Sequence, residues 1–134
     1  MPLVVWSPKY SLGIEVVDSQ HKSIVDLINR LHESIKAGEA RNETDEILRR
    51  MRDYALLHFA MEEKYMEEFG YEGLKEHLVE HETFRRKVPE FEESFRQGDL
   101  TVALDIMRFL MDWLLRHIQF VDHKYAPLFK ERGL

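Results

Sequence analysis

The spacing of apolar residues most limits what this chain of 134 residues can fold into. Apolar side chains recur at intervals of three and four residues, the period of an amphipathic helix, in four successive stretches. These stretches run from Ile24 to Ile35, from Ile47 to Phe69, from Leu74 to Phe95 and from Ala103 to Val121. Each gap between them contains a glycine, the residue at which helices commonly end. The pattern therefore predicts an all-α fold.

Four amphipathic helices with short connections favour an antiparallel four-helix bundle in up-down-up-down order, because this arrangement buries four apolar stripes together. The length supports one core, so we expect a single domain over residues 1–134. Residues 1–17 contain two prolines and several apolar side chains, which predicts an extended N-terminal arm packed on the bundle. Asp18 or Ser19 is the expected cap of the first helix, and Pro89 is expected to kink the third.

Charge and composition exclude several classes of protein. The net charge of -6 argues against nucleic-acid binding, and the lack of cysteine rules out disulfides, thiolate ligands and iron–sulfur clusters. No run of 18 apolar residues is present, so we expect no membrane span. The N-terminus also lacks the pattern of a signal peptide. We therefore expect a cytoplasmic protein.

Polar residues interrupt the apolar stripes of all four predicted helices. The residues concerned are His21, His58, Glu62, His77, His81 and His117. A single histidine on an apolar face is usually a core residue with a hydrogen-bonded neighbour. Here, however, the alternating helix directions bring all six positions to the same end of the bundle. Burying so many polar groups without partners would be costly, and a metal would satisfy all of them.

The number of these side chains exceeds what one ion usually takes from a protein, which favours two metals bridged by carboxylates. Asp122 is the candidate for a second bridge beside Glu62. It follows His117 by five residues, about 140° apart on an ideal α-helix. Both side chains can therefore face inward only if the helix loosens, ends or bulges between them. The residue types alone leave iron, zinc, copper and nickel open.

The ordered set His21, His58-Phe59-x-x-Glu62, His77-x-x-x-His81 and His117-Ile118-x-x-x-Asp122 resembles the hemerythrins, specifically the single-domain bacteriohemerythrins. The resemblance covers nearly the whole chain and implies reversible O2 binding at a non-haem di-iron site. It implies that His77, His81 and His117 bind one iron, while His21 and His58 bind the other, which keeps an open position. Glu62 and Asp122 would bridge the two irons together with a solvent-derived oxo or hydroxo group.

An apolar pocket is expected around the O2 position, because it would keep water and protons away from the bound ligand. The residues that we expect to form it are Phe59, Trp113, Leu114 and Ile118. His32 and His123 are not expected to bind metal. His32 lies eleven residues after His21, roughly 16 Å along a helix axis, and His123 directly follows Asp122 and should point elsewhere.

Three other functions stay open at this point. A ferritin-like di-iron oxidase or iron-storage protein is disfavoured, because those sites use Glu-x-x-His pairs and none occurs at these histidines. A sensor that reports O2 or redox state to a partner protein is a second alternative, and a structural bundle with adventitious zinc is a third. The preferred interpretation is a non-enzymatic O2 carrier or store, monomeric, with a protein that accepts the O2 as a conceivable partner.

Overall fold

The computed structural model describes residues 2–134, and every regular element in that range is helical. Three long helices, α1 (Glu15–Lys36), α2 (Ala40–Glu68) and α3 (Leu74–Arg96), are followed by a fourth rod. This rod consists of α4 (Val102–Asp112), the π-helix η2 (Trp113–Val121) and the short 3-10 helix η3 (Asp122–Lys124). The 3-10 helix η1 (Pro8–Tyr10) and α5 (Ala126–Glu131) lie near the chain ends.

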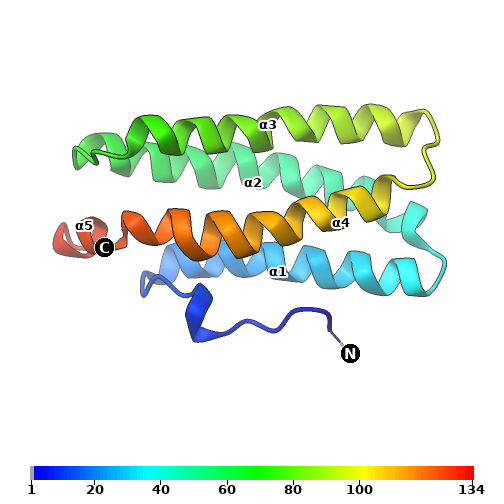
Figure 1. Cartoon of the computed structure of the whole chain (residues 1–134), viewed down its shortest axis with the longest axis horizontal. Helices are drawn as coiled ribbons and strands as arrows, with labels where there is room; N and C mark the ends of the chain where they lie inside the picture. The colour runs from blue at the N-terminus through cyan, green and yellow to red at the C-terminus, as the bar shows by residue number, and fades with distance from the viewer. Residues whose placement is uncertain (1) are drawn as a thin grey trace.

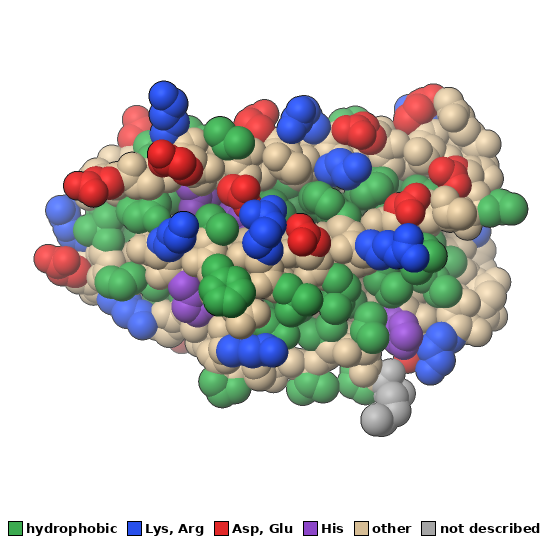
Figure 2. All heavy atoms as spheres, in the orientation of Figure 1, with side chains coloured by type: hydrophobic (Ala, Val, Ile, Leu, Met, Phe, Trp, Pro, Cys, Tyr) green, Lys and Arg blue, Asp and Glu red, His purple; other side chains and the backbone are tan. Residues whose placement is uncertain are grey.

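Figure 1 shows the four rods side by side, with successive rods running in opposite directions. The predicted antiparallel four-helix bundle is thus confirmed. No helix among the described residues combines the length and hydropathy that crossing a membrane would need. On the face drawn in Figure 2, acidic and basic side chains are interspersed.

The ends of the helices match the predicted glycine positions better than the predicted caps. Gly38, Gly70 and Gly98 all have positive φ angles, between 67° and 79°, which a glycine adopts without steric cost. The predicted cap of the first helix is wrong: α1 begins at Glu15, before Asp18 and Ser19, and its N-cap residue Ile14 makes no side-chain cap bond. The arm is correspondingly shorter than predicted. Downstream, α3 continues through Pro89 without a break in helix.

The N-terminal arm packs against the bundle, as its apolar residues predicted. Val4, Tyr10 and Leu12 are buried. The Asn29 side chain on α1 bonds both the amide and the carbonyl of Val4, at 2.9 and 2.8 Å. The Asp18 carboxylate accepts the amide of Leu12 at 2.8 Å instead of capping a helix. These bonds fix the arm along α1 (Figure 1).

The buried apolar residues form two separate clusters rather than one. The larger cluster fills most of the bundle and includes Ile24, Phe59 and Ile118. The smaller one lies toward the end that carries α5 and consists of Leu12, Ile14, Val17, Met66, Tyr125, Ala126 and Phe129. Along α1, α2 and the fourth rod, residues of the two clusters are separated by a buried polar residue. A polar layer therefore lies between two apolar ones.

Candidate metal centre

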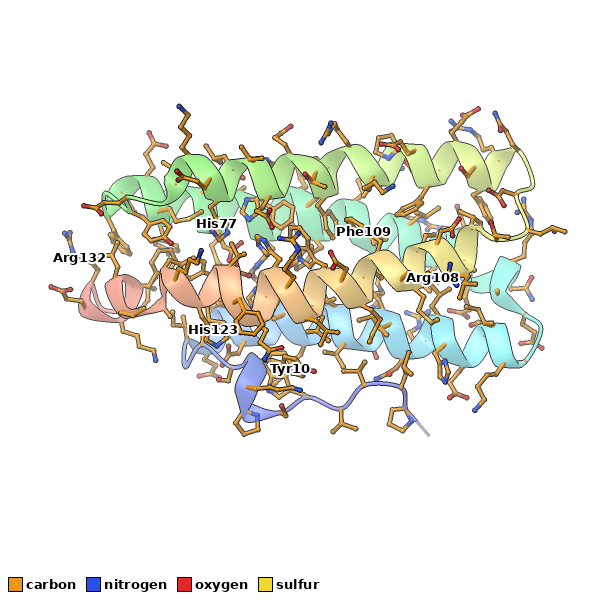
Figure 3. The ribbon with its side chains drawn as sticks, viewed as in Figure 1. Tyr10, His77, Arg108, Phe109, His123 and Arg132 are labelled. Atoms are coloured by element: carbon orange, nitrogen blue, oxygen red, sulfur yellow. The ribbon has the colours of Figure 1, made fainter. Side chains whose placement is uncertain are left out.

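The polar layer contains the seven side chains that the sequence singles out. They come from all four rods and none is more than 2% exposed: His21, His58, Glu62, His77, His81, His117 and Asp122. Two further polar residues are buried among those that the structure describes: Ser34 and Thr44 each bond a backbone carbonyl four residues earlier in their own helix. Ser34 and Thr44 are thus satisfied by the backbone, whereas the polar side chains of the layer face one another. In Figure 3 the labelled His77 lies between α3 and the fourth rod.

Helix geometry explains how the first three rods present these groups. His58 and Glu62 are four residues apart on α2, and His77 and His81 are four residues apart on α3. Residues at this spacing lie one above the other on the same helix face. Each pair therefore projects into the bundle with its side chains at neighbouring heights.

The fourth rod uses a different geometry, which confirms the prediction that it must loosen. Residues Trp113–Val121 form a π-helix, whose hydrogen bonds join residues five apart. The backbone amide of Asp122 bonds the carbonyl of His117, so that bond joins the two predicted site residues. This change of pitch brings both side chains to the inside of the bundle.

The first group of facing atoms belongs to His77, His81, His117 and Asp122. The Nε2 atoms of His77 and His117 each lie 3.0 Å from Asp122 Oδ1. The Nε2 atom of His81 lies 3.2 Å from Glu62 Oε1. One ligand atom from each residue of this group lies within 4.8 Å of all the others, which is close enough for all to surround a single ion.

The second group consists of His21, His58, Glu62 and the same Asp122. The Nε2 atoms of the two histidines are 3.1 Å apart. His21 Nε2 is 3.0 Å from Asp122 Oδ2, and His58 Nε2 is 3.2 Å from Glu62 Oε1. Both carboxylates thus contact imidazoles of both groups, so the two groups are contiguous and could hold two adjacent ions.

The charges of the layer are those of a site that attracts cations. Burial by itself raises the pKa of Asp122. The neighbouring His117, His21 and His77 lower it by more than burial raises it, so this carboxyl is ionised. Burial and the charge of Asp122 raise the pKa of Glu62, and His58 and His81 bring it below its usual value. In the metal-free chain, Asp122 and Glu80 outweigh burial and raise the pKa of His117 to about 9.

Several buried atoms of the layer lack a hydrogen-bond partner within residues 2–134. They are His21 Nδ1, His77 Nε2, His81 Nε2, His117 Nε2, Glu62 Oε1, Asp122 Oδ1 and Asp122 Oδ2. Buried polar atoms are nearly always satisfied, and each exception calls for an explanation. Imidazole nitrogen and carboxylate oxygen are good donors to first-row transition metals. The residues therefore fit a pair of such ions without cysteine.

Aromatic rings cover several imidazoles of the layer. Phe59 stacks on His81 and Trp113 stacks on His117, each with 3.8 Å between ring centroids. Tyr54, which the sequence did not single out, stacks on His58 at 4.7 Å and accepts a hydrogen bond from Trp113 Nε1. All four residues predicted to form the apolar pocket are buried in the larger cluster, Leu114 and Ile118 included. Phe59 and Trp113 thus lie flat against the three-histidine group.

Four polar residues near the layer were missed by sequence reasoning. Gln20 Oε1 accepts a hydrogen bond from His58 Nδ1, Glu63 accepts one from His81 Nδ1, and Glu80 accepts one from His117 Nδ1. The hydroxyl of Tyr125 bonds Glu62 Oε2. Glu63 and Glu80 are partly exposed and interrupt no apolar stripe, so the helical spacing of apolar residues does not mark them as site residues.

The two remaining histidines lie outside the layer. His32 is only partly buried and belongs to neither group of facing atoms. The ring nitrogens of His123 lie 3.1 Å from the carbonyl oxygen of Ile118 and 2.9 Å from that of Ser11. Figure 3 shows His123 beside η1. His123 therefore contacts the N-terminal arm.

Comparison with known proteins gives a consistent result. The model of the Hemerythrin HHE cation binding domain matches residues 12–129. A bacteriohemerythrin of Pseudomonas aeruginosa (strain LESB58) is 38% identical over 126 residues, which is 94% of this chain and 81% of that protein. A bacteriohemerythrin of Methylococcus capsulatus (strain Bath) is 34% identical over 95% of this chain and 97% of its own. A crystal structure of wild-type hemerythrin superposes with a TM-score of 0.82 at 33% identity, covering 94% of this chain and 97% of its own.

Proposed function

The chain belongs to the hemerythrin family, and on that premise we propose that it binds O2 reversibly at two non-haem irons in the buried polar layer. When bound, the two irons would supply the binding position for O2 and the electrons that its reversible binding requires. The residues of the chain hold the ions, exclude water and orient the imidazoles.

We propose that His77, His81 and His117 hold one iron and that His21 and His58 hold the other. Glu62 and Asp122 would bridge the two. The contacts of Asp122 support this division, because its Oδ1 atom faces His77 and His117 while its Oδ2 atom faces His21. Glu62 Oε1 similarly faces one imidazole of each group. With only two histidines, the second ion has fewer protein ligands, and this leaves room for O2.

The buried surroundings support binding rather than turnover. Phe59, Trp113, Leu114 and Ile118 are at most 1% exposed and exclude bulk water from one side of the layer. Tyr125 donates to Glu62 from the other side and orients that carboxylate. A dry site limits the entry of protons, which would otherwise promote the irreversible loss of reduced oxygen. The protein would accordingly act as a carrier or store and not as an enzyme.

The observation that carries the proposal is a set of six buried atoms that face one another across two contiguous groups and have no hydrogen-bond partner among the described residues; they belong to His77, His81, His117, Glu62 and Asp122. An absorption spectrum of the iron-loaded protein, recorded before and after air is removed, tests it. Charge-transfer bands that vanish on deoxygenation and return with air are expected. Bands that change only once in air, with consumption of a reductant, would instead indicate an oxidase. Two bound irons with no spectral response to O2 would refute reversible binding.

Three further parts of the proposal concern the setting of the protein. We propose that it is monomeric and cytoplasmic and that it passes O2 to an acceptor protein. Size-exclusion chromatography and cell fractionation test the first two points. An O2-dependent change in affinity for a partner would instead favour a sensor.

A further inference from the structure

The two groups of histidines differ on the side that faces away from the ions. In the three-histidine group, His81 Nδ1 donates to Glu63 Oε2 at 2.7 Å and His117 Nδ1 donates to Glu80 Oε1 at 3.2 Å. In the two-histidine group, His58 Nδ1 donates to the neutral amide oxygen of Gln20. His21 Nδ1 is buried and has no hydrogen-bond partner in the described part of the chain. Negatively charged acceptors therefore stand behind only one of the two groups.

An arginine lies against each of the two outer carboxylates. Arg116 lies 2.7 Å from Glu80 Oε1, and Arg85 lies 3.0 Å from Glu63 Oε2. The side chains of Glu63 and Glu80 are only 23–25% exposed, so water screens their charges incompletely.

A charged acceptor on the outer nitrogen makes an imidazole a stronger base and fixes its ring orientation. A more basic ligand favours the metal ion of higher charge. A neutral amide on the same nitrogen fixes the ring without adding negative charge. The outer hydrogen bonds should therefore act differently on the two ions, even though all five ligands are imidazoles.

Building on the proposed function, we propose that Glu63 and Glu80 are positioning residues that make the ion of the three-histidine group the first of the two to be oxidised. Because the neutral Gln20 adds no negative charge behind His58, the ion held by His21 and His58 is the harder of the two to oxidise. The asymmetry of the outer hydrogen bonds thus sets the order in which the pair gives up its two electrons.

The test compares Glu80→Gln with Glu76→Gln in the iron-loaded protein. Glu76 is exposed and lies one turn before Glu80 on α3, so both changes remove one negative charge from the same helix. Midpoint potentials are measured by spectroelectrochemical titration with dithionite and ferricyanide. A tenfold loss in the preference for the oxidised over the reduced ion raises the midpoint potential of a one-electron couple by about 59 mV. Glu80→Gln should raise the first potential by at least this amount, and Glu76→Gln should change it far less.

The reciprocal variant is Gln20→Glu, which places a carboxylate behind His58 with little change of shape. It should lower the second potential, that of the two-histidine ion, and leave the first nearly unchanged. Glu63→Gln repeats the first test at His81 if Glu80→Gln does not fold. Iron content and the melting temperature of the metal-free variants show whether each chain is intact.

Equal shifts for Glu80→Gln and Glu76→Gln would overturn the proposal, since only net charge would then matter. So would a Gln20→Glu variant that changes the first potential rather than the second. Failure of the proposed function gives a different result: the wild-type protein would show two potentials but no O2-dependent spectrum.

Discussion

Removing the metal should destabilise this protein strongly, because the polar layer is built from groups that lack partners in the apolar interior. Six buried atoms that face the interior of the layer have no hydrogen-bond partner among the described residues: His77 Nε2, His81 Nε2, His117 Nε2, Glu62 Oε1 and both carboxylate oxygens of Asp122. An unsatisfied buried polar atom costs about 1–3 kcal/mol, so the lower end for these six atoms is roughly 6 kcal/mol. That is comparable to the entire stability of an ordinary domain.

Part of this cost is recovered in the metal-free protein. Protonated histidines can donate to Asp122 and Glu62 across the 3.0–3.2 Å contacts of the layer. If such pairs recover about half of the cost, roughly 3 kcal/mol remains. A domain of this size shifts its melting temperature by roughly 3–6 °C per kcal/mol. We therefore expect chelator treatment to lower the melting temperature by at least about 9 °C.

Differential scanning calorimetry of iron-loaded and chelator-treated protein measures the difference. Asp122→Asn is the matched control, because it has nearly the same shape but lacks the carboxylate that both groups share. The chelator should leave the melting temperature of this variant unchanged. Equal melting temperatures for loaded and metal-free wild-type protein would refute the reasoning, as would an equal drop in Asp122→Asn.

Three more predictions concern the layer and its surroundings. Glu62→Ala or His117→Ala should abolish stoichiometric iron, whereas His32→Ala and His123→Ala should retain it; elemental analysis after purification decides, and the reverse pattern would disprove the proposed ligands. Phe59→Ala should destabilise the protein by about 3–5 kcal/mol, measured by urea unfolding, because it empties a fully buried ring position. The metal-free protein should lose stability as the pH rises from 6.5 to about 9, because His117 is protonated more readily in the folded chain than in the unfolded one. Urea unfolding across that range tests this, and stability that stays level or increases would contradict it.

Much of the architecture was predictable because it depends on local periodicity. The apolar intervals of three and four residues indicated four helices, and polar residues at inward positions identified a buried layer. The count of five residues between His117 and Asp122 was enough to predict a departure from α-helical pitch, and the π-helix at Trp113–Val121 confirms it. These inferences needed only the chain itself and the known geometry of helices.

Other features depend on tertiary contacts that the period does not encode. Asp18 has the residue type of a helix cap, but its carboxylate bonds the arm residue Leu12 while α1 begins three residues earlier. Glu63 and Glu80 occupy partly exposed positions, where acidic residues are common, so only the folded structure reveals their bonds to His81 and His117. The role of the seven buried side chains as ligands stays a prediction until metal is measured.

The π-helix also determines where this chain can change in length. Inserting or deleting one residue between His117 and Asp122, in the second half of the π-helix, would rotate every downstream position relative to His117 and turn Asp122, together with the Tyr125 that supports Glu62, away from the layer. The turn at residues 97–101, at the far end of the bundle, has no such constraint. Natural length variants of this protein should therefore carry their indels in that turn, and a library of single-residue indels should show the same contrast in iron content.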